Sequence, residues 1–277
     1  MNIAVLSGKG GTGKTFVSCN LASAIGKSAY IDCDVEEPNG HLFFKPEKVR
    51  SQDVCVKLPQ IIVDKCNQCR KCTDFCHFNA LAFIKGKPML FRGVCHSCGG
   101  CKIVCPNHAI VEKDYPIGVI HIGKHRSVTI KSGIMNMGEE SGVPIIRELL
   151  KNLPCKDNVI DCPPGSACTV MESIKDADYC VIVAEPSIFG VHNFQMVYEL
   201  VKILKKPFGV VINKADGQEN PMQELCEKLK LPVLEQIPFD RDIAAQNAAG
   251  NIAYETNERA KEIFDRLYAK MVVSTEL

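Results

Sequence analysis

The chain has 277 residues, enough for one or two domains of about 150 residues each. Hydrophobic residues make up 46% of it and charged residues 23%, which is typical of a globular protein with a sizeable core. A formal charge of +1 argues against a nucleic-acid binder held by bulk electrostatics. No apolar stretch reaches the roughly 18 residues of a membrane span, and the N-terminus lacks signal-peptide features, so we expect a cytoplasmic protein.

Outside residues 55–113, continuously apolar runs alternate with helical patterns, as in a parallel sheet covered on both faces. The predicted strands are Ile3–Ser7, Ala29–Asp32, Val159–Asp161, Cys180–Ala184, Gly209–Asn213 and Val233–Ile237. The predicted helices are Thr15–Ile25, Pro144–Asn152, Phe194–Leu204, Met222–Lys230 and Asn257–Met271. We therefore predict a doubly wound, mostly parallel α/β domain in residues 1–54 and 114–277, interrupted by a small α+β domain in residues 55–113.

A glycine-rich segment joins the first predicted strand to the first predicted helix. It reads Gly8-Lys9-Gly10-Gly11-Thr12-Gly13-Lys14-Thr15 and satisfies the pattern G-x-x-x-x-G-K-[ST] in the context that this motif requires. Its glycines permit a tight turn whose backbone N–H groups, with the helix N-terminus, can surround phosphate oxygens. We expect Lys14 to contact the β- and γ-phosphates and the Thr15 hydroxyl to ligate Mg²⁺.

A second lysine inside this loop points to a particular family. The form K-G-G-x-G-K-T, which begins at Lys9, resembles the deviant phosphate loop of the MinD/ParA/Mrp ATPases, a group that includes the nitrogenase iron protein. The resemblance implies Mg²⁺-dependent ATP hydrolysis by a nucleotide-dependent homodimer, in which Lys9 reaches the partner subunit's nucleotide as an arginine finger does. MinD ends in a basic amphipathic membrane helix, whereas Ala260–Met271 is mixed in charge, so we expect no membrane anchor and no nucleic-acid partner.

Two aspartates match the nucleotide-sensing carboxylates of this family. Asp34 follows the second predicted strand and matches the aspartate that orients the attacking water. Asp161 ends a later strand, just before the turn Pro163-Pro164-Gly165, and matches the carboxylate of the Mg²⁺ shell. A single aspartate at a strand end is often a helix cap, but two after a phosphate loop favour a Mg²⁺ site.

Two further positions resemble contacts to the nucleotide base. Asn213 closes a predicted strand, as the base-contacting asparagine of these ATPases does, but Asn213 to Asp216 also spells N-K-x-D, the guanine-reading signature of GTPases. The deviant loop favours ATP, and GTP stays open. Pro238, in the segment Ile237-Pro238-Phe239-Asp240, resembles the late loop that flanks the base.

Sixteen cysteines are the unusual feature of the composition. Without a signal peptide we expect reduced thiols, so metal ligation explains a cluster of cysteines better than disulfides do. Eight of them form two runs of identical C-x₂-C-x₂-C-x₃-C spacing: Cys66, Cys69, Cys72 and Cys76, then Cys95, Cys98, Cys101 and Cys105.

This spacing is that of bacterial two-cluster ferredoxins, in which the fourth cysteine of each run ligates the other cluster. It implies one 4Fe–4S cluster on Cys66, Cys69, Cys72 and Cys105, and a second on Cys95, Cys98, Cys101 and Cys76. Zinc is the alternative, but zinc ribbons use four thiolates rather than eight. His77 departs from the pattern, which has proline after the fourth cysteine. Residues 65–113 carry eight Lys or Arg against Asp74 and Glu112, an excess that offsets cluster charge and suits an acidic redox partner.

These patterns lead to one preferred function and two alternatives. The preferred one is an ATPase in which ATP binding and hydrolysis drive a dimer rearrangement coupled to electron transfer through two clusters. The first alternative is a spatial-regulation or scaffold ATPase whose clusters are structural or sensory and which binds a client protein. The second is an iron–sulfur cluster carrier, against which weighs the absence of any cysteine after Cys226, where carriers often have a Cys-x-x-Cys pair.

Overall fold

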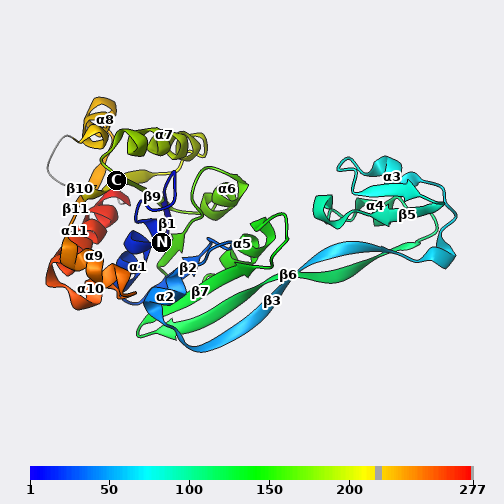
Figure 1. Cartoon of the computed structure of the whole chain (residues 1–277), viewed down its shortest axis with the longest axis horizontal. Coiled ribbons are helices and arrows are strands. Elements are labelled where there is room, and N and C mark those ends of the chain that lie inside the picture. The colour runs from blue at the N-terminus through cyan, green and yellow to red at the C-terminus, as the bar shows by residue number, and fades with distance from the viewer. Residues whose placement is uncertain (216–219, 276–277) are drawn as a thin grey trace.

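The computed structural model describes residues 1–215 and 220–275 of the chain. It consists of a broad α/β body and a small lobe, which a long two-stranded ribbon carries away from the body (Figure 1). The ribbon leaves from one edge of the sheet, whereas the first strand of the chain lies in the middle of the sheet. Both cysteine runs lie in the small lobe.

Nine strands form the sheet of the body, in the order β11-β10-β9-β1-β8-β2-β7-β6-β3. They are β1 (Asn2–Leu6), β2 (Ala29–Asp32), β3 (Glu47–Ile61), β6 (Ile110–His125), β7 (Val128–Met135), β8 (Asn158–Asp161), β9 (Tyr179–Ala184), β10 (Phe208–Ala215) and β11 (Val233–Pro238). The strands from β11 to β7 pair in parallel, while β6 pairs antiparallel with β7 and with β3. The central strands β1, β8 and β9 are buried on both faces, which explains their continuously apolar sequences.

Helices cover both faces of this sheet. One core is closed by α1 (Lys14–Ile25), α2 (Gly40–Phe44), α10 (Ala253–Thr256) and α11 (Glu258–Thr275), with α9 (Arg241–Ala248) beside them. The other is closed by α5 (Val143–Leu150), α6 (Cys168–Ile174), α7 (Ile188–Ile203) and α8 (Pro221–Leu229). Tyr30, Phe44 and Phe264 are fully buried in the first core, and Ile145 and Phe194 in the second. The body is therefore a doubly wound α/β structure, as predicted.

The six predicted strands and five predicted helices are all present, with ends that differ by a few residues. The largest difference at a helix start is in α7, which begins at Ile188 rather than at Phe194 because Ser187 caps it by accepting a hydrogen bond from the Gly190 N–H. The strand β7 was not predicted. Polar residues interrupt its apolar pattern, and one of them, Lys131, is buried and donates to the carbonyl oxygen of Leu149.

The ribbon consists of β3 and β6, which pair from Glu47 and Lys124 at the body to Ile61 and Ile110 at the lobe. The predicted domain boundaries, after residues 54 and 113, fall inside these two strands. Residues 47–53 of β3 are exposed and mostly polar, and charged residues interrupt the start of β6, so a search for apolar runs does not find these strands. Because the same two strands belong to the sheet at one end and to the lobe at the other, residues 55–113 as a separate domain remain a proposal.

Two similar halves make up the small lobe. The first contains the 3₁₀ turn η1 (Val63–Lys65), α3 (Lys71–Phe75) and β4 (Leu81–Ile84), and the second contains η2 (Arg92–Val94) and α4 (Gly100–Ile103). β5 (Lys87–Leu90) pairs antiparallel with β4 and connects the halves. Cys72, Leu81 and Ile110 form a small core between them. In residues 1–215 and 220–275 no helix has the length and apolar character to cross a membrane.

Candidate functional site

The phosphate loop lies between β1 and α1, at the carboxyl ends of the parallel strands. Gly13 has a positive φ of 92°, and a Cβ on it would lie 2.1 Å from Nδ2 of Asn213, so the position requires glycine. The Gly165 N–H donates to the carbonyl oxygen of Ser7 at 2.9 Å. This bond fixes the Pro-Pro-Gly turn to the start of the loop, so the structure brings together the two segments that we expect around the phosphates.

Lys14 and Asp161 form a buried ion pair beneath this loop. Their Nζ and Oδ1 atoms are 2.6 Å apart, and the two side chains are 7% and 1% exposed. Ser18 Oγ also donates to Oδ1, at 3.1 Å, and the Tyr30 hydroxyl donates to Oδ2 at 2.7 Å. Burial is the largest single effect and lowers the pKa of Lys14, but Asp161, Asp32 and Asp34 together raise it by more, so Lys14 remains a cation. Thr15 follows in the first turn of α1 and is partly exposed.

Asp32 and Asp34 add two more carboxyl groups at the same edge of the sheet. Asp32 lies directly opposite Asp161 in the pairing of β2 with β8. Burial, and then the Asp161 carboxylate, raise the pKa of Asp32 to about 8. Burial also raises the pKa of Asp34, to about 6, although Lys14 opposes the shift. Three neighbouring carboxyl groups make a place where a bound cation would relieve the repulsion between them.

Glu185 holds two lysines at the rim of the loop. It directly follows β9, and its Oε2 lies 2.7 Å from Nζ of Lys9, while its Oε1 lies 2.6 Å from Nζ of Lys214. Burial raises the pKa of Glu185, but the two lysines lower it further, so the net shift is downward. Lys214 also donates to the carbonyl oxygen of Gly11 at 2.8 Å. Lys9, which we expect to act across a dimer, is therefore engaged within its own subunit.

Asn213 stabilises the phosphate loop through a hydrogen bond from its side chain. Its Nδ2 donates to the carbonyl oxygen of Thr12 at 2.8 Å, and the residue is only 6% exposed. Pro238 ends the neighbouring strand β11, and the next residue, Phe239, donates its N–H to the carbonyl oxygen of Ala215 at 2.9 Å. The two predicted base contacts thus lie at adjacent strand ends. Asp216, the last residue of the N-K-x-D motif, lies outside the described residues.

Sequence analysis missed Asp32 and Glu185. Asp32 forms an I-D-C-D sequence with Asp34, and Glu185 directly follows a predicted strand. Both are acidic residues at the carboxyl ends of buried parallel strands, the edge at which this fold places its ligands. That position was the available signal. The partners of the two carboxyl groups depend on the folded structure, so the sequence alone could not identify them.

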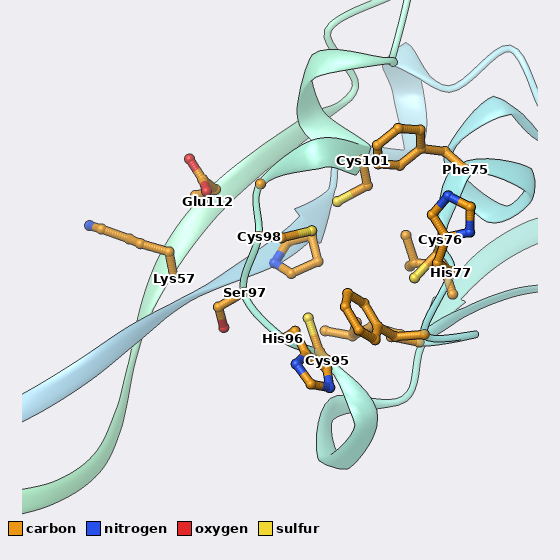
Figure 2. A pocket seen from close by; sticks show the side chains of 16 residues that line it. Lys57, Phe75, Cys76, His77, Cys95, His96, Ser97, Cys98, Cys101 and Glu112 are labelled. Atoms are coloured by element: carbon orange, nitrogen blue, oxygen red, sulfur yellow. The ribbon is translucent and has the colours of Figure 1, made fainter. Parts of the chain in front are cut away.

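The eight clustered cysteines divide between two cavities in the small lobe. The larger, of about 150 Å³, is lined by Cys76, Cys95, Cys98 and Cys101. The smaller, of about 20 Å³, is lined by Cys66, Cys69, Cys72 and Cys105. Figure 2 shows the sulfur atoms of Cys76, Cys95, Cys98 and Cys101, the second quartet, directed toward one common space. Each cavity therefore combines three cysteines of one run with the fourth cysteine of the other.

An approximate twofold repeat of the backbone produces this exchange. Cys66 and Cys95 occupy equivalent positions 29 residues apart, and η1 and η2 precede them with the same spacing. The N–H of Ile62 donates to the carbonyl oxygen of Ala109 at 2.7 Å, and the equivalent N–H of Phe91 donates to Ala80 at 2.8 Å. The start of each half is thus bonded to the end of the other half, which brings each fourth cysteine to the opposite cavity.

The loops of the two cysteine runs also have matching backbone conformations. Gln68 and Arg70 in the first run have positive φ angles of 60° and 63°, and the equivalent Ser97 and Gly99 have 53° and 73°. Left-handed residues at alternate positions turn the chain around a centre rather than along a line. Both runs therefore curve around their cavities in the same way.

The clustered cysteines lie in a partly apolar environment, in which Cys76, Cys101 and Cys105 pack against the small core of the lobe. The Ala109 N–H donates to Cys105 Sγ at 3.2 Å, and burial raises the pKa of the Cys101 thiol to about 11. Four thiolates around one Zn²⁺ ion lie about 4 Å from one another. Across residues 1–215 and 220–275, no set of three or more His, Cys, Asp or Glu stands close enough to hold a single ion.

Comparison with known proteins places the geometry in a wider group. The profile of the CobQ/CobB/MinD/ParA nucleotide-binding domain matches residues 3–252. An uncharacterised protein of Methanocaldococcus jannaschii is 30% identical over 277 residues, which cover 98% of this chain and 96% of that protein. An iron-sulfur cluster carrier protein of Saccharolobus solfataricus is 25% identical over 268 residues, which cover 90% of this chain and 74% of that protein.

One solved structure shows the same fold over nearly the whole chain. It is the septum site-determining protein MinD of Pyrococcus horikoshii in complex with Mg-ADP. The TM-score is 0.61 at 19% sequence identity, and the alignment covers 98% of this chain and 95% of that chain. At this level of identity the likeness concerns the fold.

Proposed function

The chain belongs to the CobQ/CobB/MinD/ParA nucleotide-binding family, and we propose that it is a Mg²⁺-dependent ATPase whose nucleotide state acts on electron transfer through two 4Fe–4S clusters. The phosphate loop and its carboxylates support the first half of this proposal. The arrangement of the cysteines supports the second half.

The buried pair of Lys14 and Asp161 supports ATP binding. A triphosphate offers Lys14 several anionic oxygens, so we expect Lys14 to leave Asp161 and contact the β- and γ-phosphates. Asp161 and the Thr15 hydroxyl would then hold Mg²⁺, which neutralises phosphate charge when bound. Asp34, with a pKa of about 6, is largely ionised at neutral pH and can orient the attacking water through its carboxylate.

The position of Lys9 supports an active homodimer. Its side chain is 38% exposed at the rim of the loop, and Glu185 is its ion-pair partner. In a dimer whose second subunit faces this rim, Lys9 would contact the phosphates of the nucleotide that is bound to the second subunit. In that arrangement each Lys9 supplies a cation in trans to the charge that develops during phosphoryl transfer.

The exchange of the fourth cysteine between two cavities is the observation that carries the redox part of the proposal. Three cysteines of one run and the fourth of the other are the ligands of each cluster in two-cluster ferredoxins. When bound, such a cluster supplies reversible one-electron transfer. Backbone N–H groups that donate to ligand sulfurs, as Ala109 does to Cys105, are among the features that set its potential.

A cluster carrier is the second candidate, because the relative from Saccharolobus solfataricus bears that name. A carrier must release its cluster to a client, so its ligands need to be accessible. Here one cysteine of each quartet, Cys69 or Cys98, is exposed, whereas Cys72 is buried and the other five are only partly exposed. These cysteines favour retention of the clusters over their release. Structural or sensory clusters in a scaffold ATPase would occupy the same cavities. Cluster potentials that do not depend on the bound nucleotide would favour that function over the redox function.

Metal analysis of protein purified without oxygen tests the proposal. We expect about eight irons and eight inorganic sulfides per chain, and paramagnetic signals after reduction with dithionite. Cys76→Ser should lower the iron content by about half, because it removes a ligand from the larger cavity, whereas Cys55→Ser, an exposed cysteine outside both runs, should not. Stoichiometric zinc without labile sulfide would overturn the redox function.

A further inference from the structure

The two halves of the small lobe share a backbone but differ in charge. Five cations lie in the first half: Lys65, Arg70, Lys71, Lys85 and Lys87. The equivalent positions, 29 residues later, hold Val94, Gly99, Gly100, Asp114 and Pro116. If these cations only offset the charge of bound clusters, both halves would need them equally. The second half has three cations of its own, Arg92, Lys102 and Lys113, so the larger number in the first half requires a different explanation.

Arg70 and Lys71 lie at one side of the exposed Cys69 thiol. Both directly follow Cys69 in the chain, and both are exposed. The Arg70 guanidinium lies over the Phe83 ring, 4.6 Å from its centroid, which fixes the long side chain against the lobe. The stacking leaves the hydrogen-bonding edge of the guanidinium available to an acidic group.

Lys85 and Lys87 lie on either side of the turn between β4 and β5, which is next to the cysteine loop. They flank Gly86, on which a Cβ would lie 3.9 Å from Oε1 of Gln68, the residue before Cys69. Pro88 lines the smaller cavity together with Cys69 and Arg70. The turn therefore lies against the cysteine loop. We call Arg70, Lys71, Lys85 and Lys87 the Cys69 patch.

Within the described part of the chain, no ion pair neutralises the Cys69 patch, whereas cations near the larger cavity have partners. Lys102 pairs with Glu112 at 2.8 Å, and Lys57, which lines that cavity, pairs with Asp114 at 2.6 Å. Cys69 is also the exposed member of its quartet, since Cys72 is buried and the other two are partly covered. The unneutralised charge thus lies on the two segments next to the exposed cysteine of the smaller cavity.

We propose that the Cys69 patch docks a small acidic one-electron carrier protein, a proposal that rests on the clusters of the proposed function. Opposite charges accelerate association and orient the two proteins. One electron leaves the reduced carrier, which is oxidised, and reduces the group held by the quartet of Cys69; no bond breaks and no proton moves. A protein is favoured over a nucleic acid because the ring of Phe83 is covered by Arg70 and is not free to stack on a base.

The test uses the complete holoprotein and a plant-type [2Fe–2S] ferredoxin of net negative charge as the probe. The variant is Lys71→Glu with Lys87→Glu, and the matched control is Lys27→Glu with Lys261→Glu, two exposed lysines of the body. At low ionic strength we expect the second-order rate of electron transfer, measured by stopped flow, to fall at least tenfold for the patch variant. The control should stay within twofold of the wild type, and the difference should vanish at high salt.

Iron content and binding separate the possible outcomes. A patch variant with full iron and an unchanged rate would overturn the docking proposal while leaving the clusters in place. Wild-type protein without iron would instead overturn the proposed function. Calorimetric titration of the two oxidised proteins should show binding that the patch variant loses. If labelled single-stranded DNA binds the patch more tightly than the ferredoxin does, the partner is a nucleic acid and the proposal is wrong.

Discussion

The Met135 N–H donates to the carbonyl oxygen of Val35 at 2.8 Å, which joins the end of β7 to the residue after Asp34. Val35 also packs against the far end of segment 136–142, since a Cβ on Gly142 would lie 2.4 Å from its Cγ2. Segment 136–142 is therefore fixed at both ends to the backbone that carries an expected nucleotide-sensing aspartate. A movement of Asp34 would be transmitted to this segment.

The same segment contacts the small lobe near the larger cavity. The Tyr115 hydroxyl donates to Oε1 of Glu139 at 3.2 Å, and Arg92 lies over the Tyr115 ring. Glu140 lies against Gly93, on which a Cβ would be 3.0 Å from its Oε1. Arg92 and Gly93 belong to η2, which directly precedes Cys95. A continuous set of contacts thus runs from the segment after β2 that carries Asp34 to the cavity of the second quartet.

We expect nucleotide to shift the potential of the cluster in the larger cavity more than that in the smaller one. The reason is that displacement of η2 would change the exposure of the second quartet, and exposure is one determinant of cluster potential. Arg92→Ala should reduce the shift. Lys202→Ala, which removes a comparable contact with Tyr198 in α7 at 5.4 Å, should retain it. Anaerobic redox titrations with ADP and with a non-hydrolysable ATP analogue measure the effect.

Thermodynamic reciprocity provides an independent check of this coupling. If nucleotide alters the cluster potential, reduction must alter the ATP affinity by the corresponding factor. Identical potentials in the two nucleotide states, together with equal ATP affinities of oxidised and reduced wild-type protein, would show that the nucleotide site and the clusters are not coupled. That result would favour the scaffold or sensor function.

Substitutions of Lys14 and of Lys9 are expected to impair different steps, ATP binding and ATP hydrolysis respectively. Lys14→Ala should abolish ATP binding, because it removes the buried cation beneath the phosphate loop. Lys9→Ala should bind ATP with nearly normal affinity but lose hydrolysis by on the order of 100-fold or more, because its cation acts in trans. Equilibrium dialysis, turnover and analytical ultracentrifugation with ATP distinguish the two. Hydrolysis at the native rate by Lys9→Ala would contradict the role in trans.

Glu185 is expected to restrain dimer formation. Its carboxylate holds Lys9 at 2.7 Å within the same subunit, so this ion pair must open before Lys9 can reach across. Glu185→Gln weakens the ion pair without changing the size of the side chain. We expect it to dimerise at a severalfold lower ATP concentration than the wild type, and Glu199→Gln, which changes an exposed pair with Lys202, serves as the control. An unchanged midpoint would mean that the pair is not a restraint.

The body of the fold could be predicted because its strands are buried on both faces and therefore apolar throughout. The runs of β1, β8 and β9 show this directly. The ribbon could not be predicted in the same way. β3 and β6 are stabilised along most of their length by backbone pairing with each other, and their exposed side chains carry no regular apolar pattern. β7 was missed because Lys131 interrupts its apolar pattern. The buried ammonium group of Lys131 donates to the carbonyl oxygen of Leu149, a contact that the local sequence does not reveal.

The site shows the same division between local and tertiary information. The phosphate loop and the cysteine runs are local patterns whose residue types determine their chemistry, so sequence sufficed to place them. The engagement of Lys9 by Glu185, and of Asp161 by Tyr30, depends on segments that meet only in the folded sheet. The charge difference between the two halves of the lobe was present in the sequence. It could be interpreted only after the structural repeat identified which positions of the two halves are equivalent.

Asp32 is expected to make the nucleotide-free protein less stable as the pH rises. Burial and the nearby Asp161 carboxylate raise its pKa from 3.8 to about 8. Between these values the folded protein binds a proton that the unfolded chain does not, so the free energy of unfolding falls as the pH increases. The stabilising contribution is complete below about pH 4 and is lost as the pH passes through about 8.

Replacement of Asp32 by asparagine should remove this part of the pH dependence. Asparagine cannot ionise, yet its carbonyl oxygen can still accept the Gly40 N–H, which donates to Asp32 at 2.9 Å. Urea denaturation in EDTA at pH 5 and at pH 8 measures the effect. The wild-type midpoint should fall between the two values by more than that of Asp32→Asn, and Asp53→Asn, at an exposed position of the ribbon, should follow the wild type. Parallel slopes for all three proteins would mean that the pKa of Asp32 is not raised in the folded state.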